Sequence, residues 1–184
     1  MPAARVVRTA CNGCEAPGRP IACARAAGPY DGALRAIIHA FKYDRRRSLA
    51  RPLAALMRRA GAEALDGADA CVPVPLHWRR RWQRGFNQAE ELAVHLGVPV
   101  VCALRRTRRT HVQAALHADD RAANVAGAFA ARWRALVAGS VLVLVDDVAT
   151  TGATLEACAR ALRAAGAREV RAVTAARVAV RSWR

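Results

Sequence analysis

Apolar positions along this chain of 184 residues follow a helical period in some stretches and run continuously in others. Leu34, Ile37, Ile38 and Phe41 recur every three or four residues, which predicts an amphipathic helix that begins near residue 30. The segment before it, residues 1–29, contains Gly, Pro and three Cys but has no apolar periodicity. We expect that segment to be irregular.

The rest of the pattern alternates between strands and helices. In chain order it predicts a helix at 49–65 with Pro52 in its first turn, a strand at 69–75, a helix at 87–96, a strand at 98–104, a polar loop at 105–120, a short helical piece at 121–124, an extended segment at 127–133, a strand at 140–146, a helix at 153–165 and a strand at 169–178. Such alternation indicates an α/β fold, in which helices cover both faces of a parallel, twisted sheet.

The net charge of the chain indicates which class of partner the protein could bind. The formal net charge is +16 and the isoelectric point is about 11.4, which favours polyanionic partners such as nucleic acids, phosphates or pyrophosphates. A second interpretation stays open, because Lys42 is the only lysine among 30 basic residues and the chain is rich in alanine. That usage is typical of a GC-rich genome, although it does not explain the excess of basic over acidic residues.

The apolar content predicts neither a membrane protein nor a disulfide-rich one. No apolar run approaches the roughly 20 residues that span a bilayer, and no signal-peptide core is present. We therefore expect a cytoplasmic protein without membrane insertion. The six cysteines are scattered and do not suggest a disulfide framework; three in apolar surroundings are expected to be buried thiols: Cys71, Cys102 and Cys158.

The stretch VLVLVDDVATTGATLEAC, residues 141–158, carries the most specific chemistry. Asp146 and Asp147 end an apolar strand, and ligands of open parallel sheets bind beyond the carboxyl ends of strands. The next turn offers hydroxyl groups, a glycine and the start of a helix, which together make a phosphate cradle: Thr150, Thr151, Gly152 and Thr154. A sugar phosphate needs this combination. The alternative is that the acids merely end a strand and Thr154 caps the helix.

Other nucleotide-binding motifs are missing from the sequence. There is no G-x-x-x-x-G-K-[ST], and no G-x-G-x-x-G follows a predicted strand. The acidic stretch instead resembles the phosphoribosyl-pyrophosphate (PRPP) motif of type I phosphoribosyltransferases. The resemblance implies that Asp146 and Asp147 hold the ribose hydroxyls of Mg²⁺-bound PRPP and that the loop holds its 5′-phosphate: Val148, Ala149, Thr150, Thr151, Gly152, Ala153 and Thr154. In the 6-oxopurine branch a third acid stands where this chain has Thr150, and its absence argues against salvage of hypoxanthine or guanine.

Two further blocks narrow the resemblance to one branch. VPVPLHWRRRWQRGFNQAEELA (72–93) and YDGALRAIIHAFKYDRRRSLARPLA (30–54) resemble the ComF/GntX family, as does a spaced pattern between residues 113 and 129. The resemblance implies an association with natural competence and DNA uptake. It also implies a small zinc ribbon in front of the transferase domain, so we divide the chain into residues 1–29 and 30–184.

Two basic segments are candidates for the diphosphate. The loop after the strand at 69–75 is expected to bind pyrophosphate through guanidinium groups, unless it is a solvated basic loop: Arg79, Arg80, Arg81 and Arg84. The loop at 105–120 corresponds in position to the flexible hood of type I enzymes, where basic groups would shield the diphosphate: Arg105, Arg106, Arg108, Arg109 and His111.

The N-terminal cysteines suggest a remnant of a zinc site. Cys11-x-x-Cys14 has zinc-knuckle spacing and Cys23 follows, but structural zinc usually has four ligands. Only the last pair of the family's zinc ribbon is matched, so either the start is truncated or the ribbon has decayed. Zinc binding by this segment would therefore rest on three cysteines: Cys11, Cys14 and Cys23.

Three functions remain open at the level of the sequence. The first is an enzyme that transfers phosphoribose from Mg²⁺-PRPP to an unidentified acceptor, as a monomer or a homodimer. The second is a single-stranded DNA-binding accessory protein working with competence proteins, in which aromatic groups stack on bases beside basic ones: Trp78, Trp82 and Phe86. Packing of those aromatic groups is the alternative, and it suits Phe86 better than the tryptophans. The third is a PRPP sensor without turnover.

Overall fold

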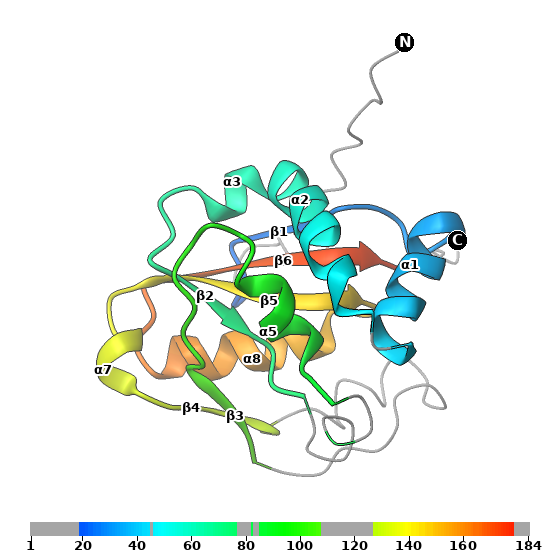
Figure 1. The fold of residues 1–184 in the computed structure, drawn as a ribbon. Helices are drawn as coiled ribbons and strands as arrows, with labels where there is room; N and C mark the ends of the chain where they lie inside the picture. The colour runs from blue at the N-terminus through cyan, green and yellow to red at the C-terminus, as the bar shows by residue number, and fades with distance from the viewer. Residues whose placement is uncertain (1–18, 45, 77–81, 83–84, 108–126, 179–184) are drawn as a thin grey trace, which may run out of the picture.

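A four-stranded parallel sheet forms the centre of the molecule in the computed structural model, which describes residues 19–44, 46–76, 82, 85–107 and 127–178 (Figure 1). Its strand order is β1-β6-β5-β2, with β1 at Cys23–Ala26, β6 at Glu169–Arg177, β5 at Val141–Ala149 and β2 at Ala70–Pro73. The two long strands, β5 and β6, are the central pair. The predicted α/β class with a parallel sheet is confirmed.

The sheet is apolar on both faces because the side chains of its central strands alternate between two hydrophobic clusters. In β5, Leu142 and Leu144 point into one cluster, whereas Val143 and Val145 point into the other. Burial on both sides explains why the strand sequence is a continuous apolar run rather than an alternating one.

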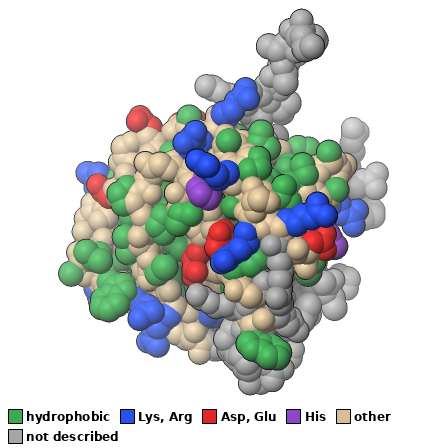
Figure 2. Space-filling view, viewed as in Figure 1, with side chains coloured by type: hydrophobic (Ala, Val, Ile, Leu, Met, Phe, Trp, Pro, Cys, Tyr) green, Lys and Arg blue, Asp and Glu red, His purple; other side chains and the backbone are tan. Residues whose placement is uncertain are grey.

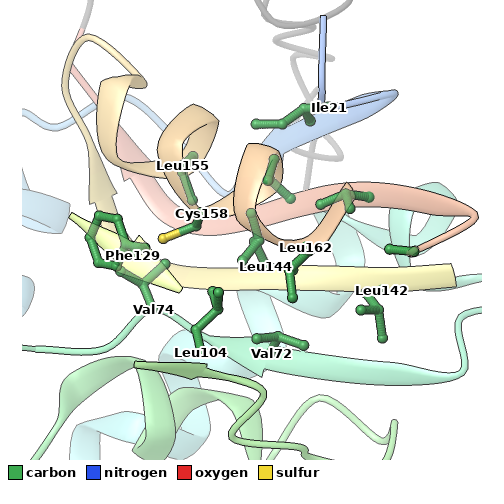
Figure 3. Close-up of a cluster of buried hydrophobic side chains, with 14 of the residues drawn as sticks. Ile21, Val72, Val74, Leu104, Phe129, Leu142, Leu144, Leu155, Cys158 and Leu162 are labelled. Atoms are coloured by element: carbon green, nitrogen blue, oxygen red, sulfur yellow. The ribbon is translucent and has the colours of Figure 1, made fainter. Parts of the chain in front are cut away.

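Helices cover both faces. Helix α8, Ala153–Ala164, packs on the first cluster, where Leu155, Cys158 and Leu162 lie over β5 (Figure 3). The second cluster receives side chains from α1 (Gly32–Tyr43), α2 (Ala50–Ala60), α3 (Ala62–Leu65) and α5 (Gln88–Ala93). Two short pieces, η1 (Arg47–Leu49) and α7 (Arg134–Val137), complete the described helices. None of the helices in the described part of the chain has the length and apolar character that crossing a membrane requires.

Strand β1 lies inside the segment that we expected to be irregular, and for residues 23–26 that expectation is wrong. The strand pairs with β6 in parallel, and the backbone N–H groups of Ala22 and Ala27 extend the pairing by donating to Val170 O (2.8 Å) and Thr174 O (3.0 Å). Four residues are too few to show a period, and the strand forms because the edge of β6 accepts it. The domain boundary after residue 29 stays a prediction.

The expected strand at 98–104 is mostly absent. Val100 forms an isolated parallel bridge with Cys71, and the amide of Cys71 donates to Pro99 O at 2.7 Å. Pro99 has no N–H group, which limits this pairing. The chain then enters strand β3, Leu104–Arg106, which pairs antiparallel with β4, Phe129–Ala131, in a separate two-stranded sheet.

The expected helix at 49–65 is divided at Gly61 into α2 and α3, with Pro52 in the first turn of α2 as predicted. A Cβ atom at residue 61 would lie 2.8 Å from Met57 O and 2.8 Å from a Cγ atom of Val173 on β6. Glycine therefore allows the end of α2 to approach the sheet closely.

Substitution of Gly61 by alanine is expected to lower the free energy of unfolding by about 1–3 kcal/mol, because the added methyl group overpacks the contact with β6. Urea denaturation followed by circular dichroism measures the change. Ala55→Ser, on the exposed side of α2, is the control and should cost no more than about 0.5 kcal/mol. Equal stability of the parent and Gly61→Ala would show that the neighbouring atoms accommodate the added methyl group without loss of stability.

Candidate functional site

The two acidic residues lie within strand β5 rather than after it. The strand continues to Ala149, and Asp146 still pairs in register with Thr174 of β6. The expected end at residue 146 is therefore three residues early, because pairing with the equally long β6 keeps the chain extended. The two acids nevertheless lie near the carboxyl end of a central strand, which has β6 on one side and β2 on the other.

Strand alternation sends the two carboxylates to opposite faces of the sheet. Asp146 is on the α8 side, next to Cys158; burial raises the pKa of that thiol, and the negative charge of Asp146 raises it further. Asp147 is on the side of α1 and is buried. The backbone N–H of Asp147 donates to Asp146 Oδ1 at 2.8 Å, which holds the first carboxylate against the strand.

Asp147 forms an ion pair with Lys42, a residue for which the sequence pattern predicts no role. Lys42 Nζ lies 2.8 Å from Asp147 Oδ1, and the two side chains are 12% and 13% exposed. Lys42 comes from the last turn of α1, so the pair joins that helix to the end of β5. The signal that could have identified it is compositional, since it is the single lysine in a chain that otherwise uses arginine.

The turn after β5 leads into α8 with the geometry expected of an anion cradle. Gly152 has φ of 81°, a left-handed conformation that favours glycine, and it precedes the first helical residue. Thr150 and Thr151 are exposed, and Thr151 Oγ1 accepts a hydrogen bond from the amide of Ala153 at 3.4 Å. Thr154 lies within the first turn of α8, so the alternative in which it caps the helix is wrong.

At the N-terminus of α8, backbone amides lie beside an acidic residue, Glu156, whose charge is offset by ion pairs. The first amides of a helix lack intrahelical acceptors and favour an anion. Glu156 in the first turn would oppose one, but it pairs with Arg19 at 2.5 Å and with Arg160 at 3.5 Å. These two arginines offset its charge, so the cradle remains suited to a phosphate group.

The predicted pyrophosphate loop lies largely outside the described residues, which include neither Trp78 nor its four arginines: Arg79, Arg80, Arg81 and Arg84. Its anchor points are described. Asn87 Nδ2 donates to Val74 O at 3.2 Å, and Asn87 Oδ1 accepts from the amide of Ala89 at 3.1 Å, which caps α5. Because Val74 directly follows β2, the neighbour of β5, the loop departs from the same edge of the sheet as the acids.

The aromatic residues near this loop differ in burial. Phe86 is buried against Phe41 with ring centroids 5.4 Å apart, and the guanidinium of Arg47 lies 5.0 Å from its ring. Packing was the expected role of Phe86 and is confirmed. Trp82 is 83% exposed, which leaves its ring accessible.

The predicted hood loop begins in a strand. Arg105 and Arg106 belong to β3 instead of a flexible loop, whereas Arg108, Arg109 and His111 lie outside the described residues. The guanidinium of Arg106 lies 5.3 Å from the ring of Phe129 on the paired strand β4. The β3–β4 ladder thus holds residues 107 and 127 together, since Thr107 bonds to Ala128 O and Gly127 O at 2.9 and 3.1 Å.

The cysteines expected to be buried differ in their exposure to solvent. Cys71 and Cys158 are buried as expected, and burial raises the pKa of the Cys71 thiol to about 12. Burial also raises the pKa of Cys158 well above its usual value. Cys102 is exposed, so its expected burial is wrong; it follows the Val100 bridge, where the chain leaves the main sheet.

Alkylation by iodoacetamide at pH 8 is expected to modify Cys102 and to spare Cys71 and Cys158 in the folded protein. The thiolate is the reactive form, and a pKa of about 12 leaves roughly one Cys71 thiol in 10⁴ ionised at that pH. Peptide-resolved mass spectrometry measures the three rates. In urea all three should react alike, and fast labelling of Cys71 without urea would contradict its burial.

The zinc prediction concerns a part of the chain that is mostly undescribed. Cys11 and Cys14 lie outside the described residues. Cys23 is half-buried in β1 and packs against the second hydrophobic cluster. In the described ranges no group of three His, Cys, Asp or Glu side chains is arranged to hold a metal. Zinc binding stays a prediction.

Comparison with known proteins identifies the class to which this fold and acidic motif belong. The model of the phosphoribosyl transferase domain matches residues 83–182, a range that includes β5, the turn and α8. The chain belongs to the phosphoribosyl transferase domain family.

Curated relatives confirm the narrower resemblance to the ComF/GntX family. DNA utilization protein YhgH of Escherichia coli (strain K12) is 38% identical over 151 residues, which are 77% of this chain and 66% of that protein. Competence protein F of Haemophilus influenzae is 34% identical over 154 residues, or 78% of this chain and 67% of that protein. The chain thus spans about two thirds of the length of these relatives.

Two solved structures resemble the chain more distantly. An allosteric regulatory enzyme of purine biosynthesis matches with a TM-score of 0.47, and the glutamine PRPP amidotransferase of B. subtilis, complexed with ADP and GMP, matches with a TM-score of 0.48. Each is 24% identical, and each match covers 75% of this chain and 30% of the other.

Proposed function

We propose that this protein binds Mg²⁺-PRPP at the carboxyl end of β5 and transfers phosphoribose to an acceptor that is still unidentified. The observation that carries the proposal is the junction of Asp146 and Asp147 with the Gly152 turn and the N-terminus of α8. Carboxylates accept hydrogen bonds from ribose hydroxyls, and helix amides attract a 5′-phosphate. Membership of the phosphoribosyl transferase domain family supports this assignment.

The residues at the site fit a magnesium-bound substrate. Mg²⁺ prefers oxygen ligands and is usually held by one or two carboxylates together with phosphates of the substrate. Asp146 is partly exposed at the site, whereas Asp147 shares its charge with Lys42. Bound Mg²⁺ would offset the charge of the departing diphosphate. The chain itself would orient the ribose through its carboxylates and the 5′-phosphate through the turn.

Arginine residues would receive the diphosphate. The loop that carries Arg79, Arg80, Arg81 and Arg84 departs beside β5, because its described ends follow β2 and precede α5. Bidentate guanidinium groups suit a leaving group with several anionic oxygens. Their role in binding pyrophosphate, and that of the residues expected in the hood, are part of the proposal.

Thermal unfolding with and without ligand tests the binding step. Mg²⁺-PRPP at 100 times its dissociation constant should stabilise the protein by about 2.7 kcal/mol, and ribose 5-phosphate or pyrophosphate alone should stabilise it less. Release of pyrophosphate across a panel of bases, amines and nucleosides then tests transfer. An unchanged melting temperature with Mg²⁺-PRPP would overturn the proposal, and binding without pyrophosphate release would favour a sensor.

A second candidate function, binding of single-stranded DNA, is favoured by exposed aromatic side chains beside basic ones. Trp82 is 83% exposed, and Trp133 is 60% exposed with the guanidinium of Arg132 at 5.4 Å from its ring. Bases stack on such groups while arginines bind phosphates. On the face that Figure 2 shows, basic side chains are dispersed and several lie beside acidic ones.

Fluorescence anisotropy with a labelled oligonucleotide tests the second candidate. Trp82→Ala and Trp133→Ala should each weaken binding by about 1–3 kcal/mol if the ring stacks on a base. Affinity should also fall steeply with salt, because arginines that bind phosphates release counterions. Leu136→Ala, which removes another exposed apolar group, is the matched control. Affinity that neither salt nor the tryptophan substitutions change would eliminate this candidate.

A further inference from the structure

The ion pair between Lys42 and Asp147 differs from the surface pairs of this protein. Both of its side chains are nearly buried, whereas the partners in Arg47–Glu91 are 59% and 27% exposed. Surface pairs contribute little to stability, and a buried pair often contributes no more than apolar residues of the same shape would. Stability alone therefore gives a weak reason for charges at this position. The location at the end of β5 offers a functional reason.

The choice of residue is informative as well. Every other basic residue among the 30 is arginine, so whatever favours arginine in this chain does not act at position 42. The two side chains differ chemically, because an ammonium is a compact point charge and a guanidinium is a wide planar group. A nearly buried position against one carboxylate oxygen suits the smaller group.

The neighbourhood fixes where the ammonium lies. Phe41, the preceding residue, is fully buried in the second cluster and contacts the ring of Phe86. Lys42 lies in the last turn of α1, so the packing of Phe41 sets the direction from which Lys42 reaches β5. The packing of the hydrophobic core thus sets the position of Lys42 and, with it, the position of the ion pair.

We propose that Lys42 is a positioning residue of the phosphoribosyl site: it holds Asp147 through Oδ1, so that Oδ2 accepts a ribose hydroxyl. The proposal rests on the proposed function, since it assigns a role in the same site. Asp146 is held separately, by the amide of Asp147. The two carboxylates are therefore held by different groups: Asp146 by a backbone amide within the PRPP motif, and Asp147 by Lys42, which lies outside that motif.

Lys42 has a second, electrostatic effect on the same site. Two successive carboxylates carry two negative charges, and PRPP is itself a polyanion. The ammonium, 2.8 Å from Asp147, compensates one of those charges without occupying the exposed turn at Thr150 and Thr151. Binding of PRPP should consequently depend on the charge at position 42 and on its shape.

Amine labelling tests the ion pair without reference to activity. Lys42 is the only lysine, so the labelling rate of its peptide is measured directly by mass spectrometry after reductive methylation. Asp147→Asn should increase the rate by about tenfold, the equivalent of one lost hydrogen bond to a charged group. Asp146→Asn, the matched substitution on the adjacent residue, should change the rate less than about twofold. Equal labelling rates in the two variants would show that Lys42 does not form the ion pair with Asp147.

Calorimetric titration with Mg²⁺-PRPP tests the positioning role. Lys42→Met keeps an unbranched side chain of nearly the same length and removes the charge, and it should weaken binding by at least about tenfold. Lys42→Arg restores the charge but not the shape and should recover binding only in part. Arg35→Met removes one exposed positive charge from the same helix and should change affinity less than about twofold.

The outcomes separate this inference from the proposed function. If the parent protein does not bind Mg²⁺-PRPP, the proposed function fails. If the parent binds and Lys42→Met binds equally well, the positioning role fails alone. Urea denaturation of each variant shows whether it is folded, and should Lys42→Met not fold, the comparison of Lys42→Arg with the parent decides. Full recovery by Lys42→Arg would assign the effect to charge and overturn the requirement for a compact ammonium.

Discussion

The double substitution Asp146→Asn/Asp147→Asn is expected to weaken binding of Mg²⁺-PRPP by at least about 100-fold. Each carboxylate would lose a charge-assisted hydrogen bond to a ribose hydroxyl, and such a bond contributes about 1.5–3 kcal/mol. Two of them correspond to roughly 3 kcal/mol or more, and every 1.4 kcal/mol is a factor of ten in affinity. Isothermal titration calorimetry at fixed Mg²⁺ measures the change, and thermal unfolding with ligand provides an independent readout.

A carboxylate at the other end of the same strand serves as the control. Asp69 Oδ2 accepts a hydrogen bond from the amide of Val141, the first residue of β5, at 2.7 Å. Asp69→Asn should lower stability by about 1 kcal/mol and leave PRPP affinity unchanged, because the residue is remote from the turn. Should the double variant bind PRPP as the parent does, the ribose is not held by these acids and the site assignment is wrong.

Local patterns predicted the elements that position this site. β5, β6 and α8 are long, strongly apolar on the faces that they bury, and bounded by glycine or polar residues. The helix predicted at 153–165 is α8, and Gly166, with φ of 99°, follows it. Local propensity and burial agree in these segments, which is why their type and order could be predicted from the sequence.

Elements that depend on distant partners were predicted less well. β1 has four residues and β3 has three, and each exists because a neighbouring strand offers unpaired backbone groups. The end of β5 was placed too early for the same reason, since pairing with β6 carries it past Asp146. Such pairings join residues that are far apart in sequence, and a periodicity within one segment does not reveal them.

The candidate site likewise contains residues that a local pattern identifies and one residue that only the fold brings to it. Asp146, Asp147 and the glycine turn are contiguous, so a short stretch of sequence was sufficient to identify them. Lys42 belongs to a helix far from β5 in the sequence and reaches Asp147 only through the packing of α1 on the sheet. A role for Lys42 therefore becomes visible when the fold is known, although its rarity as a lysine is visible in the sequence.

Phe41→Ala is expected to lower the free energy of unfolding by about 3–5 kcal/mol, the range for loss of a fully buried aromatic side chain. Phe41 has no exposed surface, and it contacts Phe86 with ring centroids 5.4 Å apart. Domains of this kind have a total stability of about 5–15 kcal/mol, so the loss is a large fraction. Urea denaturation followed by far-ultraviolet circular dichroism measures it.

Ile37→Ala, on an exposed position of the same helix, is the control for the loss of apolar surface and should cost less than about 1 kcal/mol. The two substitutions should also differ at the site. Because Phe41 fixes the turn that carries Lys42, its loss should loosen the pair with Asp147 and increase the labelling rate of Lys42 under conditions where the variant is still folded. A destabilised Phe41→Ala variant with an unchanged labelling rate would mean that Asp147, rather than the packing of α1, determines where the ammonium lies.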